Sequence, residues 1–208
     1  MRRLLGVSGR SLSGVAARRD PHAPPEVFQR AVSELRAAQM RPEVVCEEVP
    51  APQRVAPHSA AVSADVVVDD NELATGRLVL LHNPEGHDAW QGTFRCVAYV
   101  RAEIEAEMVT DPLLGAVGWT WLTEALEAEG ALYTAPSGTV TRVASESFGG
   151  MSDEPARAEI EIRASWTPVD DAIGRHAQAW GRLLCTAAGL PHVPVGVAAI
   201  PGRRVKSR

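Results

Sequence analysis

The sequence lacks several features that define large classes of proteins. It holds three cysteines, Cys46, Cys96 and Cys185, which lie far apart among apolar neighbours. An odd number without paired spacing argues against a disulfide framework and a zinc ribbon, so we expect reduced core side chains. No apolar run approaches the roughly 18 residues of a membrane helix, and the first residues lack the apolar segment of a secretory signal. These absences predict a cytoplasmic protein without a membrane-spanning segment.

The signatures of the common enzyme families are also missing. The sequence contains no P-loop, no G-x-G-x-x-G and no HExxH, and Ser137 does not lie in a G-x-S-x-G turn. Such motifs hold phosphates, dinucleotides, zinc or a nucleophilic serine, so their absence disfavours the standard cofactor enzymes. We therefore expect no cofactor and no motif-defined metal site.

Positive charge is concentrated at the two ends of the chain. Residues 1–20 hold five arginines against Asp20, and residues 202–208 hold three arginines and one lysine, so each end carries +4. Because the net charge is -5, the part between them carries -13. An acidic body repels phosphate backbones, which disfavours nucleic-acid binding through the fold. RNA association through the arginine-rich tails is a separate hypothesis, although short terminal charge runs are usually only solvated.

Composition predicts one globular domain between two tails. Hydrophobic residues make up 45% of the chain and charged residues 23%, which is ordinary for a folded protein. Residues 1–24, rich in Arg, Ser and Gly, predict a flexible basic leader. Residues 25–191 predict a single domain, and residues 192–208 a tail that is rich in Pro and Val and then basic.

Hydrophobic periodicity predicts nine elements in the domain. Helical spacing of apolar residues predicts helices over 25–39, 94–108, 112–126 and 168–187. Strand patterns cover 42–50, 61–69, 77–82, 139–148 and 157–166. The order is α, β, β, β, α, α, β, β, α. Because the strands come as hairpins, this order predicts an α+β fold in two layers, with a mostly antiparallel sheet of about five strands and helices packed on one face.

A turn with two imidazoles and two carboxylates follows the predicted central strand. Its candidate reactive side chains are His82, Glu85, His87 and Asp88. Such groups could bind a divalent metal, or supply a general base beside an acid, if the turn brings them together. Their spacing matches no established ligand pattern, and turns favour Asn, Pro, Gly and Asp for backbone reasons alone. A polar turn is the simpler interpretation.

Tryptophan is the abundant aromatic residue, with five against two tyrosines and three phenylalanines. Trp119 and Trp121 are two apart in a predicted helix, so they cannot share a face. Gly115 and Gly118 in the same helix each cost roughly 1 kcal/mol against Ala, which suggests that a second backbone packs closely there. That backbone belongs either to a neighbouring helix or to a dimer mate. We therefore take Trp90, Trp119, Gly115 and Gly118 as candidate partner-binding residues.

Several segments in fixed order resemble a known family. They are RPEVVCEEVPAPQRVAP, ATGRLVLLHNPEG, WQGTFRCVAYVRAEIEAEM, DPLL, GWTWLTEAL, RASWTP and WGRLLCTAAGLP. Over residues 25–191 the chain resembles the actinobacterial domain-of-unknown-function family numbered 3000. The resemblance implies a cytoplasmic bacterial protein and carries no activity, substrate or site.

Two classes of function stay open. The first is a non-catalytic protein-binding or adaptor domain, self-association included, that uses the surface around Trp119 or a sheet edge. Its motivation is the extra indole, the helix glycines and the absence of a catalytic motif. The second is a small metal-dependent hydrolase with its site at the turn from His82 to Asp88.

Overall fold

The structure is a computed structural model that describes residues 23–191. Apart from Ala23 and Pro24, the predicted leader and the predicted tail lie outside this range. In chain order the elements are α1 (Glu26–Ala37), β1 (Val44–Val49), β2 (His58–Val68), β3 (Asn71–His87), β4 (Gly92–Ile104), the 3-10 turn η1 (Ala106–Thr110), α2 (Leu114–Ala128), β5 (Tyr133–Ser145), the 3-10 turn η2 (Gly149–Met151), β6 (Arg157–Pro168) and α3 (Ile173–Ala187).

All six strands belong to one antiparallel sheet with the order β1-β2-β3-β4-β6-β5. Together with the three α-helices, this sheet confirms an α+β fold. Strands β1 to β4 follow one another as a meander, and β5 and β6 form a second hairpin. The two parts join where β4 pairs with β6, so that Ala102 lies opposite Ile160.

The helix predicted over residues 94–108 is wrong, because most of that segment is strand β4. Its buried apolar side chains alternate with a period of two: Phe94, Cys96, Ala98, Val100 and Ala102. The helical pattern was misleading because β4 is a central strand, with apolar and aromatic residues on its second face as well. This strand accounts for the sixth member of the sheet.

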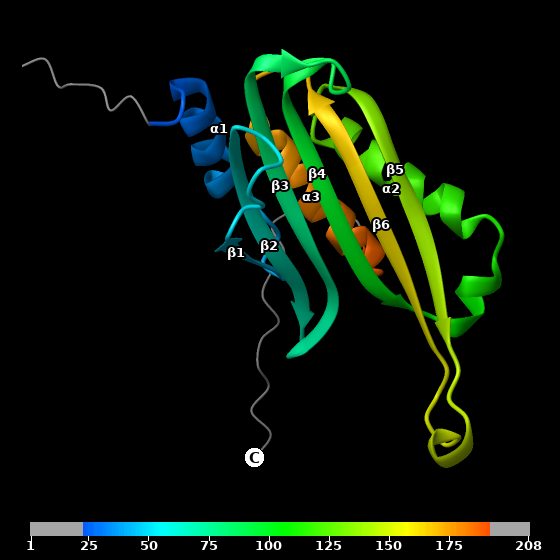
Figure 1. Ribbon diagram of the computed structural model, residues 1–208. Helices are drawn as coiled ribbons and strands as arrows, with labels where there is room; N and C mark the ends of the chain where they lie inside the picture. The colour runs from blue at the N-terminus through cyan, green and yellow to red at the C-terminus, as the bar shows by residue number, and fades with distance from the viewer. Residues whose placement is uncertain (1–22, 192–208) are drawn as a thin grey trace, which may run out of the picture.

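Helix α3 lies at the centre of the packing. It contacts β3 and β4 as well as both other helices, while α2 contacts β5. Figure 1 shows α3 behind the middle of the sheet and α2 behind β5, and the sheet face toward the viewer carries no helix among the described residues. None of the helices in residues 23–191 is long and apolar enough to cross a membrane.

The contact between α3 and the sheet depends on a glycine in β3, Gly76. A Cβ on Gly76 would lie 2.7 Å from the carbonyl oxygen of Tyr99 and 2.8 Å from Cδ2 of Leu184. Glycine therefore lets the helix approach the strand closely. The indole of Trp180 fills the same region, fully buried, and its Nε1 donates to the Tyr99 carbonyl at 3.4 Å.

A second buried indole links β6 to α3. Trp166 is fully buried, and its Nε1 donates to Nδ1 of His176 at 3.0 Å. Nε2 of His176 is buried without a hydrogen-bond partner. Since an imidazolium cannot accept a hydrogen bond at Nδ1, the contact requires the neutral ring. His176 is therefore a neutral core residue.

Candidate functional site

The predicted reactive turn is the end of strand β3: His82, Glu85 and His87 belong to that strand, where its pairing with β4 is irregular, and Asp88 follows it. Asn83 shapes it: its Nδ2 donates to the carbonyl of Gly86 at 2.7 Å, and its Oδ1 accepts from the backbone N–H of Glu85 at 3.2 Å. Gly86 has a φ of 80°, which glycine adopts without strain. Asn83 and Gly86 thus have local backbone roles.

The two histidines of this turn have different surroundings. His82 is buried, its ring stacks on Phe94 at 4.2 Å between centroids, and its Nδ1 lies 3.0 Å from the carbonyl of Thr93. Burial lowers the pKa of His82, which favours the neutral ring. His87 is exposed and stacks on Trp90 at 4.8 Å. One imidazole is a core group and the other a surface group.

The carboxylates of the turn do not complete a metal site. Glu85 and Asp88 are both exposed. Within residues 23–191, no group of three or more His, Cys, Asp or Glu side chains is placed to hold a metal ion. The four residues predicted together at this turn therefore do not form a ligand cluster in the described structure.

A buried arginine that the sequence did not single out lies next to this turn, in β4. Arg95 is only 6% exposed. Its Nη1 donates to the carbonyl of Ala135 at 2.8 Å and to Oγ1 of Thr167 at 3.0 Å. Its Nη2 donates to Oγ of Ser137 at 3.0 Å and to Oγ of Ser165 at 2.7 Å. These five residues, which we call the Arg95 network, join β4 to β5 and β6.

The Arg95 network coincides with an irregularity in β5. Ala135 has a φ of 48°, and the register between β5 and β6 shifts between Thr134 and Ser137. Such a bulge leaves backbone groups without ladder partners, and Arg95 takes up the Ala135 carbonyl. Burial lowers the pKa of Arg95, but an arginine side chain remains a cation at neutral pH.

The candidate partner residues of α2 lie beside β5. A Cβ on Gly118 would lie 3.0 Å from Cδ1 of Ile160 and 3.2 Å from Cγ1 of Val140, so Gly118 packs against the sheet. Gly115 has nothing within 4 Å of that position. The indole of Trp119 is half-buried and covers Gly138 of β5, where a Cβ would lie 2.8 Å from its Cζ3. At Gly118 and Trp119 the close neighbour of this helix is therefore the sheet of the same chain.

Exposed apolar side chains surround this part of the molecule. Leu113, just before α2, is 65% exposed, and Val117 on α2 is 42% exposed. Leu132, just before β5, is 58% exposed. We call these three side chains, Trp119 and the outer edge of β5 the β5–α2 surface.

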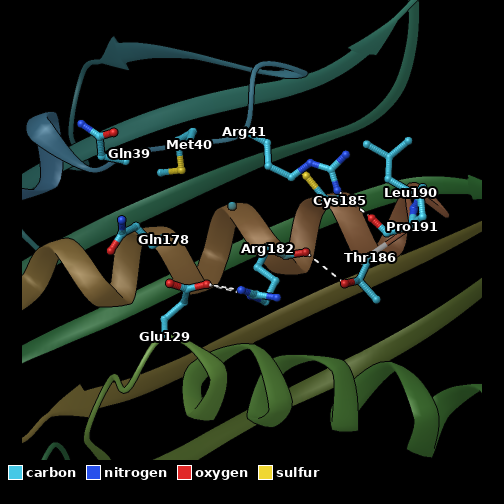
Figure 2. Close-up of a pocket in the computed structure, with 11 residues that line it drawn as sticks. Gln39, Met40, Arg41, Glu129, Gln178, Arg182, Cys185, Thr186, Leu190 and Pro191 are labelled. Atoms are coloured by element: carbon cyan, nitrogen blue, oxygen red, sulfur yellow. Dashed lines mark hydrogen bonds and ion pairs between the residues drawn. The ribbon is translucent and has the colours of Figure 1, made fainter. Parts of the chain in front are cut away.

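The pocket between α3 and the segment before β1 offers little room and few free groups (Figure 2). Its volume is about 110 Å³, well below the roughly 300 Å³ of small ligand sites. Arg41 pairs with Glu43 at 2.8 Å, and Arg182 pairs with Glu129 at 2.6 Å. Burial raises the pKa of the Cys185 thiol to about 11, so it is protonated at neutral pH and a poor nucleophile.

The fold and these surfaces define an α+β domain with a buried cation network at one end of a six-stranded sheet. The chain belongs to the family described as "Protein of unknown function (DUF3000)", which matches residues 24–198. This confirms the resemblance seen in the ordered sequence segments. No curated protein and no solved structure matches the chain.

Proposed function

We propose that this protein is a non-catalytic protein-binding or adaptor domain whose partner docks on the β5–α2 surface. The observation that carries the proposal is strand β5, which has 13 residues and lies at the edge of the sheet. An edge strand presents unpaired N–H and C=O groups that can pair with a strand of another chain. A second copy of this chain is one possible partner.

The composition of β5 supports this role. Its one charged residue is Arg142, and its one proline, Pro136, lies in the bulge near its start. Proteins commonly protect edge strands with charges, prolines or short length. In the remainder of β5, residues 137–145, Arg142 is the one such residue, and its guanidinium donates to the carbonyls of Val109 and Asp111. The apolar side chains of Leu113, Val117 and Leu132 supply area that a partner could cover.

In this proposal the three helices occupy one face of the sheet, and partners use the edge. The indole of Trp119 already covers Gly138 of β5, so in this proposal a partner contacts the part of the indole that is still exposed. Trp90 lies outside the β5–α2 surface and stacks on His87. A metal-dependent hydrolase at the turn has less support, because His82 is buried and Glu85 and Asp88 are exposed.

Self-association can be tested with full-length protein by light scattering after size exclusion across a range of concentrations. We expect a concentration-dependent dimer and slower hydrogen exchange at the β5 amides as it forms. Val117→Asp adds a charge to the β5–α2 surface and should abolish both effects. Val45→Asp is the matched control, since Val45 is 58% exposed on β1, at the opposite edge.

A different protein as the partner is the second form of the proposal. Immobilised wild type and Val45→Asp should then retain a protein that Val117→Asp does not, and β5 should be protected from exchange in that complex. A strict monomer that also captures no Val117-dependent partner would contradict the proposal.

A cytoplasmic location is part of the same proposal. It is supported by three cysteines that are all free thiols, as expected in a reducing compartment. Recovery of the protein in an extracytoplasmic fraction of its native cells would contradict this location.

A further inference from the structure

The most buried arginine of the described chain, Arg95, has no acidic partner. Arg36, Arg41, Arg101, Arg163 and Arg182 each pair with a glutamate, and all are more exposed than Arg95. Within residues 23–191 the hydrogen bonds of Arg95 go to neutral oxygens alone. Buried charges are usually neutralised by an opposite charge. The Arg95 network therefore holds positive charge that no described side chain balances.

The hydroxyl groups bonded to Arg95 differ in whether their own proton is already used in a hydrogen bond. Thr167 uses its proton by donating to the carbonyl of Trp90. Ser137 and Ser165 each accept from Nη2 of Arg95, and their oxygens are 3.2 Å apart. Since each serine has one proton, a bond between them uses one and leaves the other. One polarised hydroxyl proton is therefore free to meet an acceptor from outside.

The two serines are open to approach. Ser137 is exposed and Ser165 is half-buried. Ser165 lies between two core-facing residues, Ala164 and Trp166, so its side chain points to the opposite face of the sheet. Its cross-strand neighbours are Ser137 on β5 and Val97 on β4, the latter 37% exposed. An incoming group would reach the serines from the face without helices.

We propose that Ser137 and Ser165, backed by the Arg95 guanidinium, bind a compact oxyanion, either a carboxylate or a phosphate. The oxyanion would accept from the free serine proton, and the cation behind the two hydroxyls would stabilise its negative charge. Both hydrogens of Nη2 already bind the serines, so the guanidinium acts through these hydroxyls. This site stands on the β4, β5 and β6 strands and does not depend on the β5–α2 surface.

The test is an NMR titration of ¹⁵N-labelled full-length protein with sodium acetate and, separately, with inorganic phosphate at constant ionic strength. We expect saturable shifts of the Ser137, Gly138 and Ser165 amides, with dissociation constants on the order of 1 mM, as for one small-anion contact. Tighter acetate binding would identify a carboxylate as the ligand, and tighter phosphate binding a phosphate. Similar affinities would indicate a general oxyanion site.

A double variant, Ser137→Ala with Ser165→Ala, removes the donors and leaves Arg95 in place. It should weaken binding at least about tenfold, as expected for losing a hydrogen bond to a charged group. Ser145→Ala is the control, because Ser145 shares the strand and the face with Ser137 but lies at its far end. It should bind like wild type.

A third variant, Arg95→Met, tests the cation itself and should abolish binding if the protein remains folded. If it unfolds, the serine variants decide. The absence of saturable shifts with both anions, or unchanged affinity in the double serine variant, would overturn the proposal.

Discussion

The two edges of the sheet differ in how they are protected. Strand β1 has six residues between Pro42 and Pro50 and carries Glu47 and Glu48. Helix α1 ties down this edge through an ion pair between Arg36 and Glu48. Strand β5 is about twice as long, carries one charged residue and is flanked by exposed apolar side chains.

This difference indicates that one edge is closed to pairing and the other is available. Short length, charge and proline are the usual means by which proteins prevent sheets from adding strands. The β1 edge has all three, whereas most of β5 has none. A 13-residue edge strand with so few of these features is informative because the other edge of the same sheet shows the protected alternative.

The largest effect should come from filling the space that Trp119 occupies on β5. In Gly138→Ala the new methyl would clash with the backbone carbonyl of Arg163, and it would lie 2.8 Å from Cζ3 of Trp119 and 3.0 Å from Cα of Ala164. Backbone must move to relieve these contacts, so we expect a loss of about 3 kcal/mol in the free energy of unfolding. Chemical denaturation measures it.

The control for this variant is Gly150→Ala, in the tip of the same hairpin, where a Cβ would meet nothing within 4 Å. Its stability should be close to that of wild type. Equal stability of the Gly138 variant and this control would mean that β5 does not lie as close to the β6 backbone and to Trp119 as the structure shows.

A smaller effect is the pH dependence of the free energy of unfolding. Variants at the two edges should therefore be compared at one pH. Burial lowers the pKa of His176 to about 4, whereas an unfolded histidine has a pKa near 6.5. The unfolded chain therefore binds this proton more readily, and stability falls as the pH drops from about 6.5 toward 4. Between pH 7 and pH 5 we expect a loss of about 2 kcal/mol.

His176→Asn should reduce this pH dependence, because asparagine does not titrate and its Oδ1 can accept from Nε1 of Trp166. His82, whose pKa burial also lowers, should leave a residual slope of the same sign. Denaturation curves at several pH values measure both. An unchanged slope in the variant would show that His176 is not the titrating group.

The smallest effect compares two glycines of α2. Gly115→Ala should raise stability by about 1 kcal/mol, because alanine favours a helix and its methyl meets nothing within 4 Å. Gly118→Ala should gain less, because its methyl would lie 3.0 Å from Cδ1 of Ile160. Equal gains would mean that α2 packs on the sheet less tightly than the structure shows.

Much of the fold could be predicted from the sequence because its signals are local. The hairpin of β5 and β6 follows from alternation over residues 157–166, and α3 follows from apolar spacing. Strand β4 could not be recognised in this way, since Val97 and Tyr99 on its second face interrupt the alternation and part of its pattern also fits a helix. Pairing with β3 and β6, which are distant signals in the sequence, makes this segment a strand and not a helix.

The candidate site was less predictable because its contacts are distant in the chain. The partners of Arg95 lie between 40 and 72 residues further along. The one local signal was an arginine directly between Phe94 and Cys96, two residues that face the core. For Trp119, the sequence showed that one indole leaves the apolar stripe of the helix, but not that Gly138 receives it.

The pairing of β4 with β6 also has a consequence for synthesis of the chain. Strands β1 to β4 leave the ribosome first and can form their meander alone, because each pairs with its neighbour in sequence. Until β6 emerges, β4 is an edge strand, and the face that α3 covers is bare. Newly made chains should therefore be most prone to aggregate in this interval. One of the two central strands of the finished sheet is therefore an exposed edge strand during synthesis.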